Sequence, residues 1–172
     1  MAHFQDLSDC LYLPRSEGLG FKAVGWLERG HDYTKGEVTP EWFEKLLALQ
    51  QNRWAGPLQC AGFHTCDLCR FRFSSRWPGH DFLFRNYRFS SNSNGFLFIP
   101  SDGTLFVSPS NIPHYIDAHE YCPPPEFQAA VAACPEMRSA AYFRALLATP
   151  AREWLQRLSG KMSERLLDSP GG

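Results

Sequence analysis

Two short pairs of metal-binding side chains constrain this sequence more than any other feature. Two residues separate Cys66 from Cys69, and four separate His114 from His119. Zinc prefers four ligands at the corners of a tetrahedron, and structural zinc sites usually draw them from separate pieces of backbone. A tight turn would direct both thiolates to one point, and the histidine spacing lies within the range of zinc fingers. The sequence therefore predicts one structural zinc ion held by Cys66, Cys69, His114 and His119.

The histidine pair does not fit one face of a regular helix. With about 3.6 residues per turn, residues five positions apart project about 140° from each other. We expect the helix to loosen at His119, because the proline of Tyr121-Cys122-Pro123 follows and the residue before a proline disfavours helical backbone. His64 is a rival ligand close to Cys66, which could replace His114 or support the site from outside the ligand set.

The cysteines also have readings that involve no metal. A Cys-x-x-Cys pair can be a redox element, but such a pair follows a strand and begins a helix. Here the pair leads into a stretch rich in Phe and Arg that has no helical pattern, which favours the metal interpretation. We interpret the other four as free thiols: Cys10, Cys60, Cys122 and Cys134.

Length and composition indicate one folded domain with a C-terminal addition. The chain has 172 residues, of which 44% are hydrophobic and 20% charged, and this is the composition of a folded protein. We predict an α+β fold, with a small antiparallel β-sheet, a zinc knuckle linked to a helix, and a helical C-terminal third. The expected parts are a zinc-stabilised α+β domain over 1–134, a helical extension packed on it over 135–168, and a disordered tail over 169–172.

Local patterns place the helices of this fold. Thr39-Pro40-Glu41 combines an N-cap, an early proline and an acidic first turn, which predicts a helix over about 40–52. Ser110-Asn111-Ile112-Pro113 is a similar start and predicts the helix that carries both histidines. Three further helices are expected at about 125–133, 140–147 and 151–167.

Strand patterns are concentrated before residue 110. Asp102-Gly103 predicts a hairpin turn between strands at 96–99 and 104–107. A strand is also expected at 21–27, and the stretch from 82 to 107 should contain two or three short strands in all.

Charge and the N-terminal sequence bear on location. The formal net charge of −1 gives no overall attraction to nucleic acid or to an anionic membrane. The N-terminus lacks the basic start and apolar core of a signal peptide, and no apolar run approaches the roughly 20 residues of a membrane span. We therefore expect a cytoplasmic protein.

Several short motifs resemble those of a known family. They are Val24-Gly25-Trp26-Leu27 with Gly30-His31, Gly36 to Pro40, Gly62 to Cys69, Ile99-Pro100, Val107-Ser108-Pro109, His114 to His119, and Pro124 to Phe127. Over roughly residues 1 to 132 the chain resembles a family of small uncharacterised bacterial proteins with a GWL…H…CxxC…HxxxxH pattern. The resemblance implies a shared architecture and the same four ligands, but it implies no reaction. The arginine-rich stretch from Arg70 to Ser91 and the helices after Pro135 look specific to this chain.

A ligand set of four favours binding over catalysis. Catalytic zinc keeps an open coordination position near a carboxylate base, as in the His-Glu-x-x-His arrangement. The histidine pair here does not form that motif, and we interpret Asp117 and Glu120 as capping, paired or solvated residues. The leading hypothesis is a zinc-stabilised, non-enzymatic cytosolic protein that binds an unknown protein partner. A metal-dependent hydrolase is the more distant alternative.

Nucleic acid is the leading alternative partner. Arginines interleaved with aromatic residues suit phosphate neutralisation combined with base stacking. The same alternation fits a strand with its rings in the core and its arginines in water, which we favour because no wider basic surface surrounds it. The candidate contacts are Arg70, Arg72, Arg76, Arg85 and Arg88.

A protein partner would require an exposed apolar surface, and one candidate is an apolar stripe at helical spacing near the C-terminus. Docking of this stripe on the protein's own core is the interpretation we favour. Its residues are Trp154, Leu155, Leu158, Met162, Leu166 and Leu167.

Overall fold

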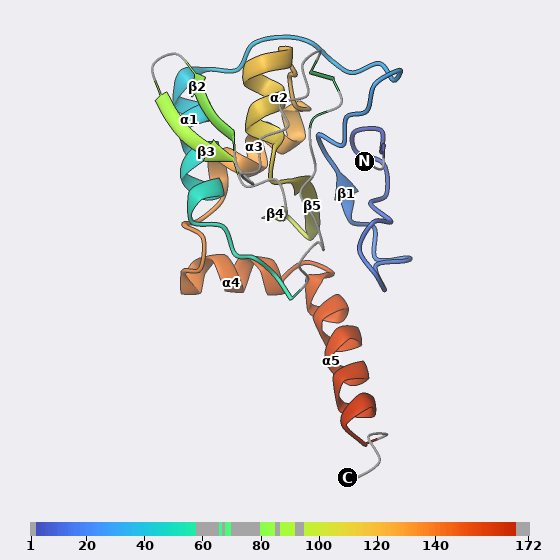
Figure 1. Cartoon of the computed structure of the whole chain (residues 1–172). Coiled ribbons are helices and arrows are strands. Elements are labelled where there is room, and N and C mark those ends of the chain that lie inside the picture. The colour runs from blue at the N-terminus through green and yellow to red at the C-terminus, as the bar shows by residue number, and fades with distance from the viewer. Residues whose placement is uncertain are drawn as a thin grey trace.

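A β-hairpin lies at the centre of the computed structural model (Figure 1). The structure describes residues 3–57, 66, 68, 69, 80–84, 87–91 and 95–167. Of these, residues 80–84, 87–91 and 160–167 are described by their backbone alone. Strands β4 (Phe96–Ser101) and β5 (Thr104–Pro109) pair antiparallel. Asp102 and Gly103 join them with φ angles of 35° and 77°, and such left-handed backbone is what tight hairpin turns require. The predicted hairpin is confirmed.

A third strand makes the central sheet mixed rather than wholly antiparallel. Strand β1 (Lys22–Ala23) pairs parallel with β5, so the strand order is β1-β5-β4. The strand expected at 21–27 is therefore much shorter than predicted. Gly25 ends the pairing, because its φ of 73° is left-handed and its N–H donates to the Asp6 carboxylate at 2.9 Å.

Two further strands form a separate ribbon. Strands β2 (His80–Phe84) and β3 (Tyr87–Ser91) pair antiparallel, with Phe82 opposite Phe89. Figure 1 shows this ribbon beside α1 and α2 rather than as part of the central sheet. Together with the hairpin it gives four strands in the stretch where two or three were expected, because the residues before Ser90 form two strands instead of one.

The predicted helices all form, at nearly the predicted bounds. In α1 the Thr39 hydroxyl accepts a hydrogen bond from the N–H of Trp42, as its capping role requires. In α2 the expected cap differs, because the Asn111 side chain instead donates to the Tyr115 hydroxyl at 3.0 Å. The helices are α1 (Pro40–Gln51), α2 (Ile112–His119), α3 (Pro125–Ala133), α4 (Ala140–Leu147) and α5 (Ala151–Leu167).

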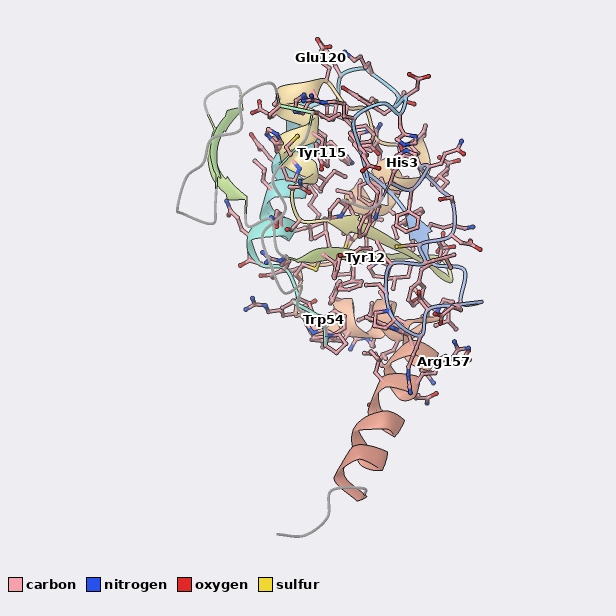
Figure 2. All side chains as sticks on the ribbon, turned by 45° about the vertical axis from the view of Figure 1, so that its right-hand side comes forward. His3, Tyr12, Trp54, Tyr115, Glu120 and Arg157 are labelled. Carbon is pink, nitrogen blue, oxygen red and sulfur yellow. The ribbon has the colours of Figure 1, made fainter. Side chains whose placement is uncertain are left out.

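Aromatic side chains fill the core around the hairpin (Figure 2). The first five residues of β4 are all buried, so the hairpin is covered on both faces. The Phe98 ring lies 5.7 Å from that of Trp154, and the Trp26 ring 5.9 Å from that of Phe96. The polar groups of buried aromatic side chains make hydrogen bonds. The Trp26 indole N–H donates to Val107 O, and the Tyr142 hydroxyl donates to Phe98 O.

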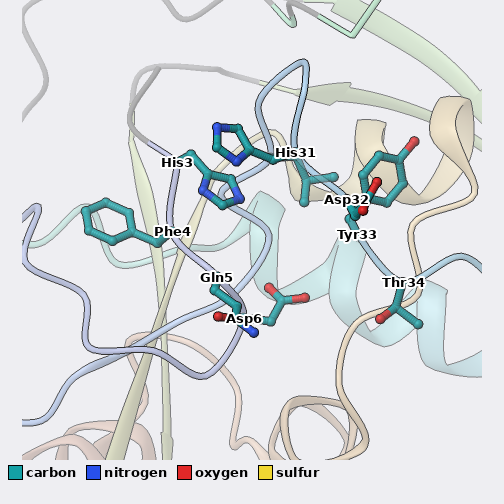
Figure 3. Close-up of a pocket in the computed structure, with 9 residues that line it drawn as sticks. His3, Phe4, Gln5, Asp6, His31, Asp32, Tyr33 and Thr34 are labelled. Carbon is teal, nitrogen blue, oxygen red and sulfur yellow. The ribbon is translucent and has the colours of Figure 1, made fainter.

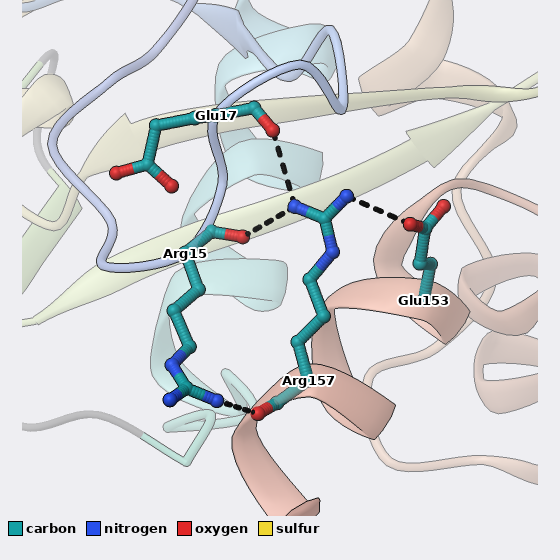
Figure 4. Close-up of polar contacts among 4 residues, drawn as sticks. All are labelled: Arg15, Glu17, Glu153 and Arg157. Atoms are coloured by element: carbon teal, nitrogen blue, oxygen red, sulfur yellow. Dashed lines mark hydrogen bonds and ion pairs between the residues drawn. The ribbon is translucent and has the colours of Figure 1, made fainter. Parts of the chain in front are cut away.

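The last helix is fastened to the N-terminal loop. Arg157 donates to the carbonyl oxygens of Arg15 and Glu17 and pairs with Glu153 at 2.7 Å, while Arg15 donates to Arg157 O (Figure 4). Beyond these contacts the C-terminal turns of α5 extend away from the rest of the molecule (Figure 1). Within the described part of the chain, no helix has the length and hydropathy needed to cross a bilayer.

The structure describes the side chains of only the first half of the C-terminal apolar stripe. Trp154 is fully buried, and Leu155 and Leu158 pack against the core. The favoured interpretation is thus confirmed for these three residues. The side chains of Met162, Leu166 and Leu167 lie outside the described ones.

Two glycines in left-handed backbone offer a matched test of close packing. Gly56 has a φ of 70°, and a Cβ there would lie 2.8 Å from the Phe98 ring, whereas Gly18 has a φ of 73° and open space around it. Gly18→Ala should cost roughly 1–2 kcal/mol of unfolding free energy through backbone strain alone. Gly56→Ala should cost roughly 1–3 kcal/mol more, because the core must also shift. Urea unfolding of both variants measures the difference, and equal losses would contradict the close approach.

Candidate metal centre

Helix α2 carries both histidines, and their rings lie next to each other. His114 lies in its first turn and His119 is its last residue. Glu120 follows with a left-handed φ of 56°, and its N–H bonds to Tyr115 O. The helix therefore ends immediately after His119, as expected from the histidine spacing. The two imidazole rings meet edge to face, with centroids 5.1 Å apart.

The cysteine pair meets these rings from a distant part of the sequence. Cys66 Sγ lies 3.3 Å from His119 Nε2, and Cys69 Sγ lies 3.3 Å from His114 Nε2 and 3.5 Å from His119 Nε2. The four ligand atoms lie within 4.8 Å of one another. No other group of three or more His, Cys, Asp or Glu side chains within the described ranges converges in this way.

These distances suit a shared cation. With Zn–S near 2.3 Å and Zn–N near 2.0–2.1 Å, a tetrahedral site places sulfur and nitrogen about 3.6 Å apart. The observed separations of 3.3 and 3.5 Å are close to that value. A ring nitrogen carries either one hydrogen or one lone pair, so His119 Nε2 cannot make a full hydrogen bond to both neighbouring sulfurs. A cation at the centre would be coordinated by all four atoms at once.

The surroundings of the cysteine pair disfavour an unpaired thiolate. Burial raises the pKa of the Cys66 thiol to about 12, and the neighbouring Cys69 sulfur adds to this effect. Backbone N–H groups of Leu68 and Cys69 donate to the Cys66 sulfur and partly offset the rise. A bound divalent cation would reverse the balance, because it stabilises the thiolate form that coordinates metal.

The segment from Arg29 to Gly36 forms hydrogen bonds with the backbone of both the cysteine pair and the histidine pair. The Arg29 guanidinium donates to Cys69 O at 3.3 Å, and the Tyr33 hydroxyl donates to His119 O at 3.2 Å. The backbone then pairs with the end of α2, where Gly36 N donates to Glu120 O and Cys122 N donates to Thr34 O. The sequence offered no pattern that marked Arg29 or Tyr33 as supports, because they lie far along the chain from the ligands.

The two carboxylates beside the histidines differ in surroundings. Glu120 is exposed and pairs with Lys35 at 3.3 Å, so the expected paired role is found. Asp117 is half-buried on α2, and burial raises the pKa of its carboxyl. Neither belongs to the cluster of four ligand atoms.

Several predicted residues cannot be placed around this centre. His64, Cys60, Arg70, Arg72, Arg76 and Arg85 lie outside the described residues, and Arg88 is described only by its backbone in β3. The arginine interface and the rival ligand therefore stay predictions. Of the other cysteines, Cys10 and Cys134 are buried free thiols and Cys122 is half-buried, as expected.

The comparisons with known proteins give one match. The model of a family described as "Domain of unknown function (DUF7919)" matches residues 2–132. This range contains all four clustered side chains and ends within α3. The expected likeness to an uncharacterised family is confirmed, while its bacterial source and its motif pattern stay predictions. No curated protein and no solved structure matches the chain.

Proposed function

We propose that this chain, which belongs to the DUF7919 family, is a zinc-stabilised binding protein of the cytoplasm that has no enzymatic activity and acts through a protein partner. The observation that carries the proposal is the convergence of Cys66, Cys69, His114 and His119 from two distant segments.

The donor set supports zinc. Two thiolates and two imidazoles in a tetrahedral arrangement suit zinc better than magnesium or calcium, which prefer oxygen ligands. Four protein ligands complete the tetrahedral shell, and complete shells are typical of structural sites. The metal would then join the cysteine knuckle to α2, whose Ile112 and Tyr115 lie in the core.

The partner and the compartment rest on separate arguments. The free thiols of Cys10, Cys122 and Cys134 suit a reducing compartment such as the cytoplasm. The C-terminal turns of α5 extend from the body (Figure 1) and offer a helix to a partner. Four protein ligands would fill the tetrahedral shell and leave no open position for the metal-bound water that a hydrolase activates.

Capture of a partner from lysate of the source cell tests this proposal. The full-length chain and its Cys69→Ser variant would be used as bait, each with and without nuclease treatment. We expect a protein in stoichiometric amount that resists nuclease and is lost with the variant, because the fold that binds it depends on metal.

Two outcomes would contradict the proposal. Loss of the captured protein on nuclease treatment, together with salt-dependent oligonucleotide binding that weakens on replacing Arg72, Arg85 and Arg88, would favour the nucleic-acid alternative. Substrate turnover that disappears with the Cys69→Ser variant would favour the hydrolase.

A further inference from the structure

The segment of residues 29–36, which we call the strap, contacts the metal centre and also forms one wall of a pocket. The pocket has a volume of about 620 Å³ and lies between the strap and the N-terminal residues 3–6. Figure 3 shows residues 31–34 on one side of it and residues 3–6 on the other. A change in the position of the strap would therefore change the shape of the pocket.

The wall opposite the strap is held by buried residues. Phe4 N donates to the carbonyl oxygen of Trp26, whose side chain is buried. The Asp6 carboxylate accepts at 2.9 Å from Gly25 N and from the hydroxyl of the fully buried Tyr121. None of these contacts involves a candidate metal ligand, so this wall should keep its position when the metal is absent.

The strap, in contrast, bonds to the backbone of two candidate metal ligands. The Arg29 guanidinium donates to Cys69 O at 3.3 Å, and the Tyr33 hydroxyl donates to His119 O at 3.2 Å. One acceptor therefore belongs to each half of the Cys and His cluster. Both bonds need the cysteine pair and the end of α2 to stay at their present separation, which a shared metal ion would fix.

The end of α2 is the part of this helix that a metal ion would stabilise most. The helix has only eight residues, and His119 is the last of them. The last turn of a helix frays easily, because its carbonyl groups lack partners within the helix. Here the carbonyl oxygens of His119 and Glu120 accept from the Tyr33 hydroxyl and from Gly36 N. Coordination of the His119 ring would hold this turn and, through it, the strap.

Two contacts of the strap do not involve a candidate ligand. Cys122 N donates to Thr34 O at 2.9 Å. The ring of His31 stacks on that of His3, with centroids 3.8 Å apart. These contacts should keep the strap near the rest of the molecule, so metal loss should loosen the strap without releasing it completely.

We propose that the metal centre controls the strap: bound metal holds residues 29–36 against Cys69 and His119 and so fixes one wall of the pocket, and metal loss loosens that wall. The inference rests on the metal site of the proposed function but not on its protein partner. It makes Arg29 and Tyr33 positioning residues, which act on the metal through the backbone of its ligands. Such coupling is reciprocal, so a loosened strap should weaken metal binding in return.

Amide hydrogen exchange of the full chain with and without bound zinc tests the inference. The Gly36 N–H reports on the strap, and the N–H groups of β4 and β5 report on the core. Removal of zinc by a chelator should speed exchange at Gly36 roughly tenfold more than in the hairpin, because the strap loses bonds that the hairpin keeps. Equal acceleration in both places would mean that metal loss acts only through general destabilisation, and it would overturn the inference.

The Tyr33→Phe variant tests the reciprocal effect, because it removes one bond of the strap and leaves all four candidate ligands in place. Competition with a chromophoric chelator should show zinc binding that is roughly threefold to tenfold weaker. Tyr142→Phe is the matched control, since it deletes a hydroxyl that bonds to Phe98 O, outside the strap and the metal centre, and it should leave zinc affinity unchanged. Unchanged affinity in Tyr33→Phe would overturn this inference alone, whereas absence of zinc from the unmodified protein would overturn the zinc assignment as well.

Discussion

Removal of the metal is expected to lower the midpoint of thermal unfolding by roughly 10 °C. A ligand that binds only the folded state at a thousand times its Kd stabilises that state by about 4 kcal/mol, and 1 kcal/mol shifts the midpoint by about 2–4 °C in a chain of this size. The metal would also link Cys66 and Cys69 to α2, so its removal would break a connection between distant segments. Melting curves with and without a chelator measure the effect, and elemental analysis should find about one zinc per chain.

Single ligand changes separate metal loss from general damage. Cys69→Ser should remove the metal, because Cys69 Sγ lies within 3.5 Å of both histidine nitrogens. The matched control is Cys134→Ala, a buried free thiol outside the centre, which should keep its metal even where it loses some stability. Cobalt substitution adds a spectroscopic check, since tetrahedral thiolate coordination produces a strong visible absorption. Retention of metal by Cys69→Ser, or absence of stoichiometric metal in the unmodified protein, would refute the assignment.

Local sequence patterns predicted the helices and the hairpin because their causes are local. Thr39 caps α1 through a bond three residues away, and Asp102-Gly103 supplies the left-handed backbone of the hairpin turn. The cluster of four ligand candidates was also predictable, since metal coordination restricts both residue type and spacing. Even the end of α2 after His119 followed from the helical angle between its two histidines.

Local sequence patterns could not predict the features that depend on contacts between distant parts of the chain. The pairing of β1 with β5 joins Lys22 to Phe106, and no local signal sets its parallel direction. The stacking of the His3 ring on the His31 ring likewise joins two segments that are far apart in the sequence. Asn111 was expected to cap α2, but the nearby Tyr115 hydroxyl takes its side-chain N–H instead. The first two features rest on contacts between distant segments, whereas the Asn111 bond is local and replaces the expected cap within the start of α2.

The C-terminal helices are expected to be an integral part of the fold, although the family match ends before them. Trp154 on α5 is the residue that tests this, because its side chain is fully buried. Its ring meets Phe21 edge to face with centroids 5.7 Å apart and lies equally close to Phe98 of the hairpin. Its indole N–H donates to Pro14 O at 3.0 Å. One side chain thus joins α5 to the central sheet and to the N-terminal loop.

Trp154→Ala should therefore lower the unfolding free energy by roughly 3–5 kcal/mol, the usual cost of deleting a large core ring. Leu147→Ala on α4 is the matched control, because that leucine is 39% exposed and its loss should cost far less. Urea unfolding measures both, and zinc content at low temperature should remain one per chain in each, since neither residue contacts the metal centre. A loss below about 1 kcal/mol for Trp154→Ala would mean that α5 contributes little to the core. The extension expected over residues 135–168 would then be appended to the domain expected over 1–134 rather than packed on it.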